Sequence, residues 1–180
     1  VKKFYEMGLP VWGEVELAYR TGKGRVLVIT GTNGKTTTTA LLGKIMSDAE
    51  DSVFVVGNIG TPYTSKALEM KPNSLTVAEI SSFQLETINK FHPQISAILN
   101  ITPDHLNRHH TMECYVETKA RIAKNQNKDE ICVLNYEDEY LKKIAKDIPA
   151  KVFWFSSEHI LEQGIWLDGE KIMYNDGSET

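Results

Sequence analysis

Short apolar runs alternate along the chain with segments of helix-forming residues, and this alternation constrains the fold more than any other feature. Short continuous apolar runs are typical of strands that a parallel sheet buries on both faces. Strands are expected at 25–30, 53–56, 75–80, 95–100, 131–134 and 152–155, and helices at 12–19, 36–47, 62–70, 81–90, 112–124 and 137–146. This order predicts an α/β fold of βαβ units with right-handed crossovers.

The two ends of the chain depart from this alternation. Apolar runs on either side of Asp168-Gly169 are typical of a β-hairpin, which we expect over 164–174. Residues 21–24 contain two glycines and no apolar side chain, so they are expected to form a linker. The expected architecture is a mostly parallel sheet flanked by helices, with a linker before it and a terminal hairpin.

Composition narrows the functional classes. The 180 residues carry a formal net charge of −4, and they are 41% hydrophobic and 24% charged, as is ordinary for a soluble globular protein. A general nucleic-acid-binding protein would carry a basic surplus, although a local basic patch stays compatible with this charge. No apolar stretch approaches the roughly 18 residues of a membrane-spanning helix, and no signal-peptide segment follows Val1-Lys2-Lys3-Phe4. We therefore expect neither nucleic acid nor a membrane as a partner.

The two cysteines, Cys114 and Cys132, fit a reducing compartment because they form no Cys-x-x-Cys pair and no secretory signal accompanies them. Cys132 lies in an apolar run and is expected to be buried. The chain does not start with Met, which suggests a fragment or a processed chain. We expect a cytoplasmic monomer.

A glycine-containing loop follows the first predicted strand and precedes a predicted helix. It consists of Gly31, Thr32, Asn33, Gly34, Lys35, Thr36 and Thr37. Glycines let backbone N–H groups approach phosphate oxygens, and a helix N-terminus adds partial positive charge. A lysine here can reach the β and γ phosphates, and the following hydroxyl can bind Mg²⁺. The loop therefore predicts binding of the ATP phosphates in a P-loop-type fold.

The spacing of this loop differs from the usual pattern. A P-loop has a glycine six residues before its lysine, and Ile29 occupies that position here. The loop is thus a shortened variant. The alternative interpretation is a glycine-rich turn between strand and helix that binds no ligand.

Polar motifs follow the other predicted strands, where ligands of an open parallel sheet bind. They are Gly57-Asn58-Ile59-Gly60, the stretch from Glu79-Ile80-Ser81-Ser82-Phe83 to Glu86, the stretch from Asn100 through Asp104-His105 to Arg108-His109, and Tyr115-Val116-Glu117-Thr118-Lys119-Ala120-Arg121-Ile122. With the loop at 31–37, this series resembles the central ATP-binding domain of the Mur ligase family, which builds the peptide stem of bacterial peptidoglycan. The resemblance is firm over 10–133 and looser beyond.

Within the family, the motif at 57–60 and the stretch at 79–86 resemble the member that adds D-glutamate. The alanine-adding member has His where Asn33 stands, and the member that adds diaminopimelate or lysine has His where Phe83 stands. The resemblance implies that ATP phosphorylates the alanine carboxylate of UDP-N-acetylmuramoyl-L-alanine. The amine of D-glutamate then attacks the acyl phosphate, and a tetrahedral intermediate collapses to an amide, ADP and phosphate.

The resemblance also implies a domain assignment. Residues 11–17 resemble the end of the family's N-terminal domain, so 1–22 are expected to be the end of that domain with its linker. Residues 23–180 are expected to be the central domain, incomplete at its C-terminal end, with the C-terminal domain absent. Since the neighbouring domains bind the UDP group and D-glutamate in this family, the isolated chain is expected to be inactive.

Phosphate and metal roles carry over residue by residue. Lys35 is expected to hold the β and γ phosphates and to act in catalysis. Thr36 and Glu79 are expected to bind the Mg²⁺ that bridges them, although Glu79 could instead cap the next helix. His105 is expected to bind a second Mg²⁺ close to the substrate carboxylate, with Asp104 orienting its imidazole.

Lys119 corresponds to a lysine that CO₂ carbamylates in the family, and its carbamate would help to hold the second Mg²⁺. Carbamylation needs a neutral amine, so burial or nearby cations would favour it. Without the resemblance, an exposed lysine on an amphipathic helix would be the first interpretation. Asn58 and Ser81 are expected to bind substrate, although a turn explains Asn58 and a helix cap explains one serine. The remaining histidines, His92, His109, His110 and His159, are expected to be solvated.

Two other functions stay open. The chain could belong to another Mur ligase or to a folylpolyglutamate synthetase, although the latter has Gly-Ser after the loop lysine where Thr36-Thr37 stands here. It could also be an ATP-binding module without ligase activity, and the second-metal residues His105 and Lys119 argue against that.

Overall fold

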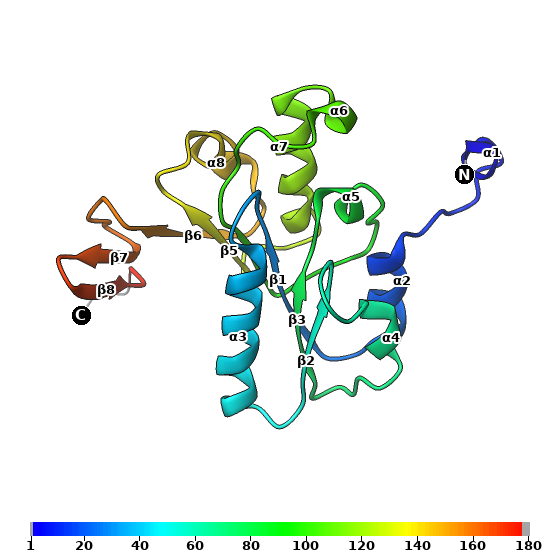
Figure 1. Ribbon diagram of the computed structural model, residues 1–180, viewed down its shortest axis with the longest axis horizontal. Coiled ribbons are helices and arrows are strands. Elements are labelled where there is room, and N and C mark those ends of the chain that lie inside the picture. The colour runs from blue at the N-terminus through cyan, green and yellow to red at the C-terminus, as the bar shows by residue number, and fades with distance from the viewer. Residues whose placement is uncertain (1, 178–180) are drawn as a thin grey trace.

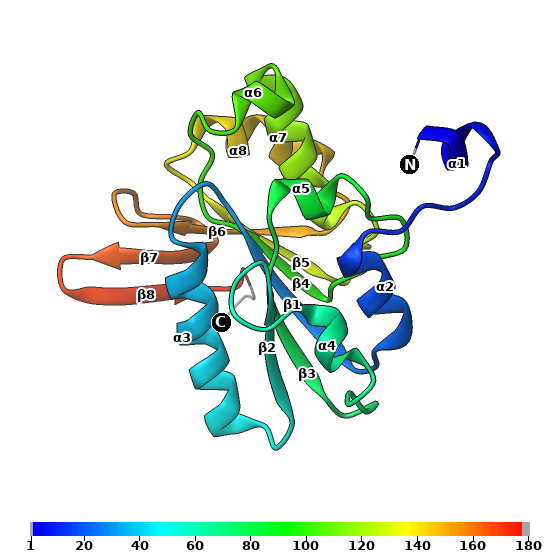
Figure 2. The ribbon, with the colours of Figure 1, turned by 45° about the vertical axis from the view of Figure 1, so that its right-hand side comes forward.

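A computed structural model describes residues 2–177 and contains one eight-stranded sheet (Figures 1 and 2). The strand order is β2-β3-β1-β4-β5-β6-β7-β8. Neighbours from β2 to β7 are parallel, and only β7 and β8 pair antiparallel. The strands are β1 (Arg25–Thr30), β2 (Val53–Gly57), β3 (Leu75–Glu79), β4 (Ile95–Ile98), β5 (Ile131–Asn135), β6 (Lys151–Ser156), β7 (Gly164–Asp168) and β8 (Lys171–Asn175). The predicted parallel α/β fold and its terminal hairpin are confirmed.

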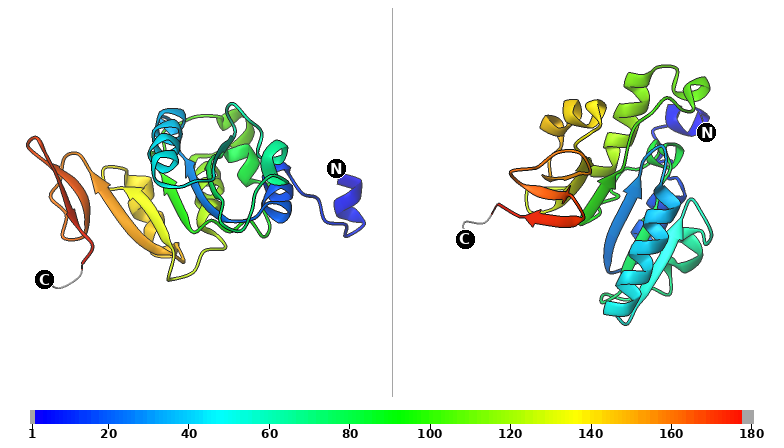
Figure 3. Two further views of the ribbon diagram at one scale, coloured as in Figure 1. Left: turned by 90° about the horizontal axis from the view of Figure 1, so that it is seen from below. Right: turned by 60° about the vertical axis from the view of Figure 1, so that its left-hand side comes forward.

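Helices flank the sheet, except for α1 (Lys2–Glu6), which lies apart from it at the N-terminal end (Figure 2). The others are α2 (Glu14–Thr21), α3 (Lys35–Ala49), α4 (Tyr63–Ala67), α5 (Ser82–Leu85), α6 (Leu106–His109), α7 (Met112–Ala120) and α8 (Glu139–Ile144), with 3-10 turns η1 (Arg121–Ala123) and η2 (Ala145–Asp147). Figure 3 shows α1 and the β7–β8 hairpin at opposite ends of the molecule. Within residues 2–177, no helix combines the length and apolar character needed to cross a membrane.

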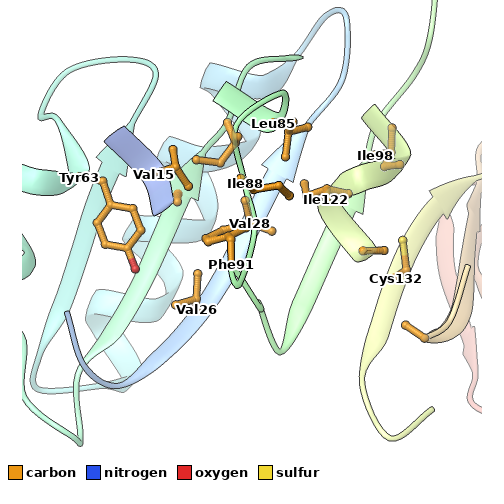
Figure 4. Packing of buried hydrophobic residues seen from close by; sticks show 14 of the residues in the cluster. Val15, Val26, Val28, Tyr63, Leu85, Ile88, Phe91, Ile98, Ile122 and Cys132 are labelled. Atoms are coloured by element: carbon orange, nitrogen blue, oxygen red, sulfur yellow. The ribbon is translucent and has the colours of Figure 1, made fainter. Parts of the chain in front are cut away.

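The main hydrophobic core lies on one face of the sheet. Because side chains alternate along a strand, Val26 and Val28 of β1 face this core, where Val15 of α2 and Tyr63 of α4 pack (Figure 4). The predicted burial of Cys132 is confirmed, since it is a member of the same cluster. Burial of this apolar surface is the main stabilising contribution to the domain.

The opposite face, beside α3, is covered less completely. Leu27 and Ile29 of β1, Ile95 of β4 and Leu41 and Ile45 of α3 contribute to an apolar groove of about 730 Å³. Leu41 is 60% exposed and Ile45 54%. The strands were predicted to be buried on both faces of the sheet. This is confirmed on the face that carries the main core, whereas the face beside α3 is only partly covered.

Several helices differ from the predictions. The helix expected at 81–90 ends at Leu85, because side chains distant in sequence bind the backbone that follows. Glu16 accepts hydrogen bonds from the N–H groups of residues 89–91, and Arg121 donates to the carbonyl groups of residues 85, 86 and 88. The helix expected at 62–70 is α4, which ends at Ala67, and the helix expected at 112–124 is α7, which ends at Ala120 and is followed by a 3-10 turn. Neither α1 nor α6 was predicted.

Candidate functional site

The loop at 31–34 leaves the carboxyl end of β1, and Lys35 starts α3. Gly34 has a φ of 80°, which is left-handed and suits glycine. Asn100, just beyond β4, holds the loop in place. Its side-chain oxygen accepts hydrogen bonds from the N–H groups of Thr32 (3.1 Å) and Asn33 (2.8 Å), and its amide donates to the Asn33 carbonyl (3.1 Å). The loop thus presents the N-terminus of the 15-residue α3, which favours an anion.

Glu79 ends β3 beside this loop, and its side chain is buried with 1% exposed. Thr36 Oγ1 donates to one carboxylate oxygen at 2.9 Å, and Asn58 Nδ2 donates to the other at 3.0 Å. Both donors are neutral, so the buried negative charge gains only partial compensation. A carboxylate and a hydroxyl are hard oxygen ligands suited to Mg²⁺. The arrangement therefore fits a divalent cation between Thr36 and Glu79.

Gly57 holds Asn58 and Glu79 in register, and its replacement by alanine is expected to destabilise the domain by about 2–3 kcal/mol. Gly57 has a φ of 118°, and a Cβ there would lie 2.1 Å from the Glu79 carbonyl oxygen. Gly60 is the matched control, because its φ of 70° is also left-handed but a Cβ would meet nothing within 4 Å. Gly60→Ala should cost about 1 kcal/mol. Equal urea midpoints for the two variants would contradict this account.

Lys119 on α7 is buried, with 2% of its surface exposed. Its Nζ donates to the Gly31 carbonyl at 2.8 Å and lies 4.7 Å from the centre of the Tyr115 ring. Burial and, secondarily, the charge of Lys35 lower the pKa of Lys119 to about 7. Because Lys119 is buried, the alternative interpretation of an exposed lysine on an amphipathic helix is wrong. At pH 7 about half of the Lys119 amine is therefore neutral, which is the form that carbamylation requires.

His105 follows β4 on the loop that leads to α6. Its Nε2 lies 3.4 Å from Asp104 Oδ2, and its backbone N–H donates to Asp104 Oδ1 at 2.8 Å. The expected pairing of Asp104 with the imidazole is present in this geometry. The side chain of His105 is 48% exposed, so it faces solvent beside Asp104.

A cavity of about 270 Å³ joins these elements at the carboxyl edge of the sheet. Its lining includes, from the predicted site, Gly31, Lys35, Asn58, Ser81, His105 and Lys119. Thr36 and Glu79 connect to it through the hydrogen bond from Asn58, whereas Thr32, Asn33, Gly34 and Thr37 are not among its lining residues. Lys35 Nζ donates to the Thr32 carbonyl at 2.8 Å. The structure thus brings six of the predicted site residues to one cavity, from four strand ends and α7.

Ser81 caps α5, since its Oγ accepts the Gln84 N–H at 3.3 Å and Gln84 Oε1 accepts the Ser81 N–H in return. The capping interpretation of one serine is confirmed. Sequence reasoning missed Asn100 and Tyr115 as site residues. The position of Asn100 at a strand end next to β1 was a usable signal, and so was that of Tyr115 one helical turn before Lys119.

His109 corrects a sequence expectation. It was expected to be solvated, but it is 3% exposed, and burial lowers the pKa of its imidazole. His110 and His159 are exposed as expected, and His92 is partly buried with its Nε2 2.7 Å from Glu130. The turn of α6 directs the His109 side chain into the protein and leaves His110 exposed. The sequence His109-His110 alone does not indicate which of the two histidines is buried.

Comparisons with known proteins identify the family to which the chain belongs. The chain is 60% identical over 178 residues to UDP-N-acetylmuramoylalanine–D-glutamate ligase of Lachnospira eligens, covering 99% of the chain and 40% of the relative. It is 57% identical over 176 residues to the enzyme of the same name from Lachnoclostridium phytofermentans, covering 98% of the chain and 39% of the relative. The chain therefore spans about 40% of the length of the curated relatives it matches.

Solved structures share the fold. A MurF ligase from Thermotoga maritima in complex with ADP superposes with a TM-score of 0.64 at 24% identity, over 88% of this chain and 39% of that one. A UDP-N-acetylmuramoyl-L-alanyl-D-glutamate–2,6-diaminopimelate ligase gives a TM-score of 0.62 at 25% identity, over 84% and 36%. Residues 29–177 match the Mur ligase middle domain, which spans the loop, the cavity and α7. The chain therefore belongs to the Mur ligase family.

Proposed function

We propose that this chain is the ATP-binding part of an amide ligase that adds D-glutamate to UDP-N-acetylmuramoyl-L-alanine through an acyl phosphate. One observation carries the proposal: Lys35, His105 and the buried Lys119 line a single cavity beside the phosphate loop. The relatives with 60% and 57% identity, both named as D-glutamate ligases, support the choice of substrates.

The phosphate loop performs the first part of this function. The N-terminus of α3 and the Lys35 ammonium would hold the β and γ phosphates of ATP and offset the charge that develops during transfer. Thr36 and Glu79 would hold Mg²⁺, which supplies charge neutralisation between these phosphates. Asn58 and Ser81, both in the cavity lining, would orient the alanine carboxylate toward the γ phosphate.

Lys119 and His105 form the second part. The neutral Lys119 amine would attack CO₂ and lose a proton, giving a carbamate anion. The carbamate and the imidazole of His105, held by Asp104, would bind a second Mg²⁺. The buried position of Lys119, its lowered pKa and its place in the lining support this assignment.

The remaining parts of the proposal concern the whole enzyme. We assign 1–22 to the end of an N-terminal domain with its linker and 23–180 to the central domain. The coverage of 40% of the curated relatives supports a longer, full-length enzyme. Its other domains would bind the UDP group and D-glutamate, so this chain alone would be inactive. We propose that the enzyme is a cytoplasmic monomer without a nucleic-acid or membrane partner.

Oxygen transfer tests the acyl phosphate. UDP-N-acetylmuramoyl-L-alanine labelled with ¹⁸O in its carboxylate is given to the full-length enzyme with ATP, Mg²⁺ and D-glutamate. The carboxylate oxygen that attacks the γ phosphorus leaves with phosphate when the amine displaces it, so each phosphate released is expected to carry one ¹⁸O. Mass spectrometry of the phosphate measures this. Unlabelled phosphate would show hydrolysis by water and would reject the ligase mechanism.

A further inference from the structure

The loop that carries His105 has an unusual backbone. His105 and His110 bracket α6, and their φ angles are 52° and 67°. Residues other than glycine rarely adopt positive φ, and such conformations persist only where surrounding contacts hold them. Residues 104–110, which we name the α6 loop, therefore need an anchor.

His109 provides the buried contacts of the α6 loop. Its Nε2 lies 3.0 Å from Ser82 Oγ, inside the protein. Its ring stacks on Phe83 with centroids 5.7 Å apart and an interplanar angle of 19°, and it lies 5.1 Å from the Tyr115 ring. Ser82 and Phe83 belong to α5, whereas Tyr115 belongs to α7. His109 thus joins the α6 loop to α5 and α7, two of the helices that contribute residues to the cavity lining.

Phe83 links this anchor to His105. The ring of Phe83 lies 4.8 Å from the imidazole of His105, so one aromatic side chain contacts both histidines. Arg108 also lies over the Phe83 ring at 4.7 Å and donates to both carboxylate oxygens of Glu86. However, Arg108 has 55% of its side chain exposed, and exposed ion pairs contribute little. Within the α6 loop, His109 is the buried residue.

We propose that His109 is a positioning residue for the reaction: it fixes the α6 loop against α5 and α7 and so holds His105 at the cavity. The inference rests on the proposed function. His109 itself is absent from the cavity lining and contacts Ser82, Phe83 and Tyr115, which do line it.

Steady-state kinetics of the full-length enzyme test this role. His109→Ala is expected to lower kcat about 10²-fold, since small misplacements of catalytic groups cost this much. The KM for ATP should change less than about 3-fold, because Asn100, which belongs to neither α5 nor α7, binds the backbone of Thr32 and Asn33 in the phosphate loop. His109→Gln retains a hydrogen-bonding group for Ser82 and should recover part of kcat. His159→Ala is the control, because His159 is exposed and lies beside Tyr136.

Two kinetic results would overturn the proposal. The first is a kcat within about 2-fold of wild type for His109→Ala. The second is a parallel loss of kcat and ATP affinity in both His109 variants, as general unfolding would give. If His109→Ala fails to fold, His109→Gln and His109→Phe decide the matter, since only His109→Gln should retain more than about a tenth of the wild-type kcat.

A spectroscopic measurement keeps this inference separate from the proposed function. The ¹H–¹³C NMR signal of the His105 ring senses the ring current of Phe83, which lies 4.8 Å away. The signal is expected to shift in His109→Ala and to stay in place in His159→Ala, whether or not the enzyme turns over. An unmoved His105 signal in His109→Ala would overturn the positioning role, whereas an inactive wild type would reject only the proposed function.

Discussion

The Lys35→Ala enzyme is expected to lose about 100-fold or more of its affinity for Mg²⁺-ATP. Lys35 starts α3 and lines the cavity next to Gly31. A charge-assisted hydrogen bond contributes about 1.5–3 kcal/mol. In the proposed site this one cation would bind both the β and the γ phosphate, so its removal is expected to cost at least about tenfold in affinity for each phosphate. Isothermal titration calorimetry of the full-length enzyme with Mg²⁺-ATP measures the change.

Lys44→Ala is the matched control for this variant. Lys44 lies on the same helix, but its Nζ pairs with Asp48 at 2.5 Å and its side chain is 72% exposed. Its loss should leave ATP affinity within about 2-fold, because exposed ion pairs contribute little. An unchanged affinity in Lys35→Ala would reject the phosphate-loop assignment.

Lys119→Met is expected to lower kcat by about 10²–10³-fold while ATP binding changes much less. The methionine fills the buried volume but cannot form a carbamate, so one charged group of the proposed second metal site is lost. Wild type incubated with ¹³C-bicarbonate should show one carbamate signal by NMR, and Lys119→Met should lack it. Lys142→Ala should keep the signal, because pairing with Glu139 raises the pKa of Lys142 and keeps that amine charged.

The pH dependence of this signal follows from the Lys119 pKa of about 7. Above pH 7 most of the amine is neutral and can react with CO₂, and as pH falls through 7 the amine takes up a proton and the reaction stops. An unperturbed lysine, with a pKa near 10.4, would show the same change about three pH units higher. A carbamate signal that Lys119→Met retains, or full activity in that variant, would contradict the role of Lys119.

The strands and the conformation of the loop at 31–34 were predictable from the sequence because local pattern determines them. The run from Val26 to Ile29 is apolar because a parallel sheet surrounds it, and Gly34 is glycine because the loop needs a positive φ there. The proximity of Asn58 and Glu79 also followed from sheet geometry, since both stand at the carboxyl ends of neighbouring strands.

The end of α5 and the burial of His109 were not predictable in this way. The backbone after Leu85 is bound by Glu16 and Arg121, which lie tens of residues away along the chain. His109 is buried because α5 and α7 close over it, while its neighbour His110 is exposed. Both features depend on long-range packing, which a window of local sequence does not contain.

Phosphate release by the full-length enzyme with a panel of amino acids tests the central claim most directly. With ATP, Mg²⁺ and UDP-N-acetylmuramoyl-L-alanine present, D-glutamate is expected to give stoichiometric ADP, phosphate and amide product. Omission of either substrate, or L-glutamate in place of D-glutamate, should reduce release to background. Equal release with L-glutamate, L-alanine or diaminopimelate would contradict the assignment as a D-glutamate-adding ligase.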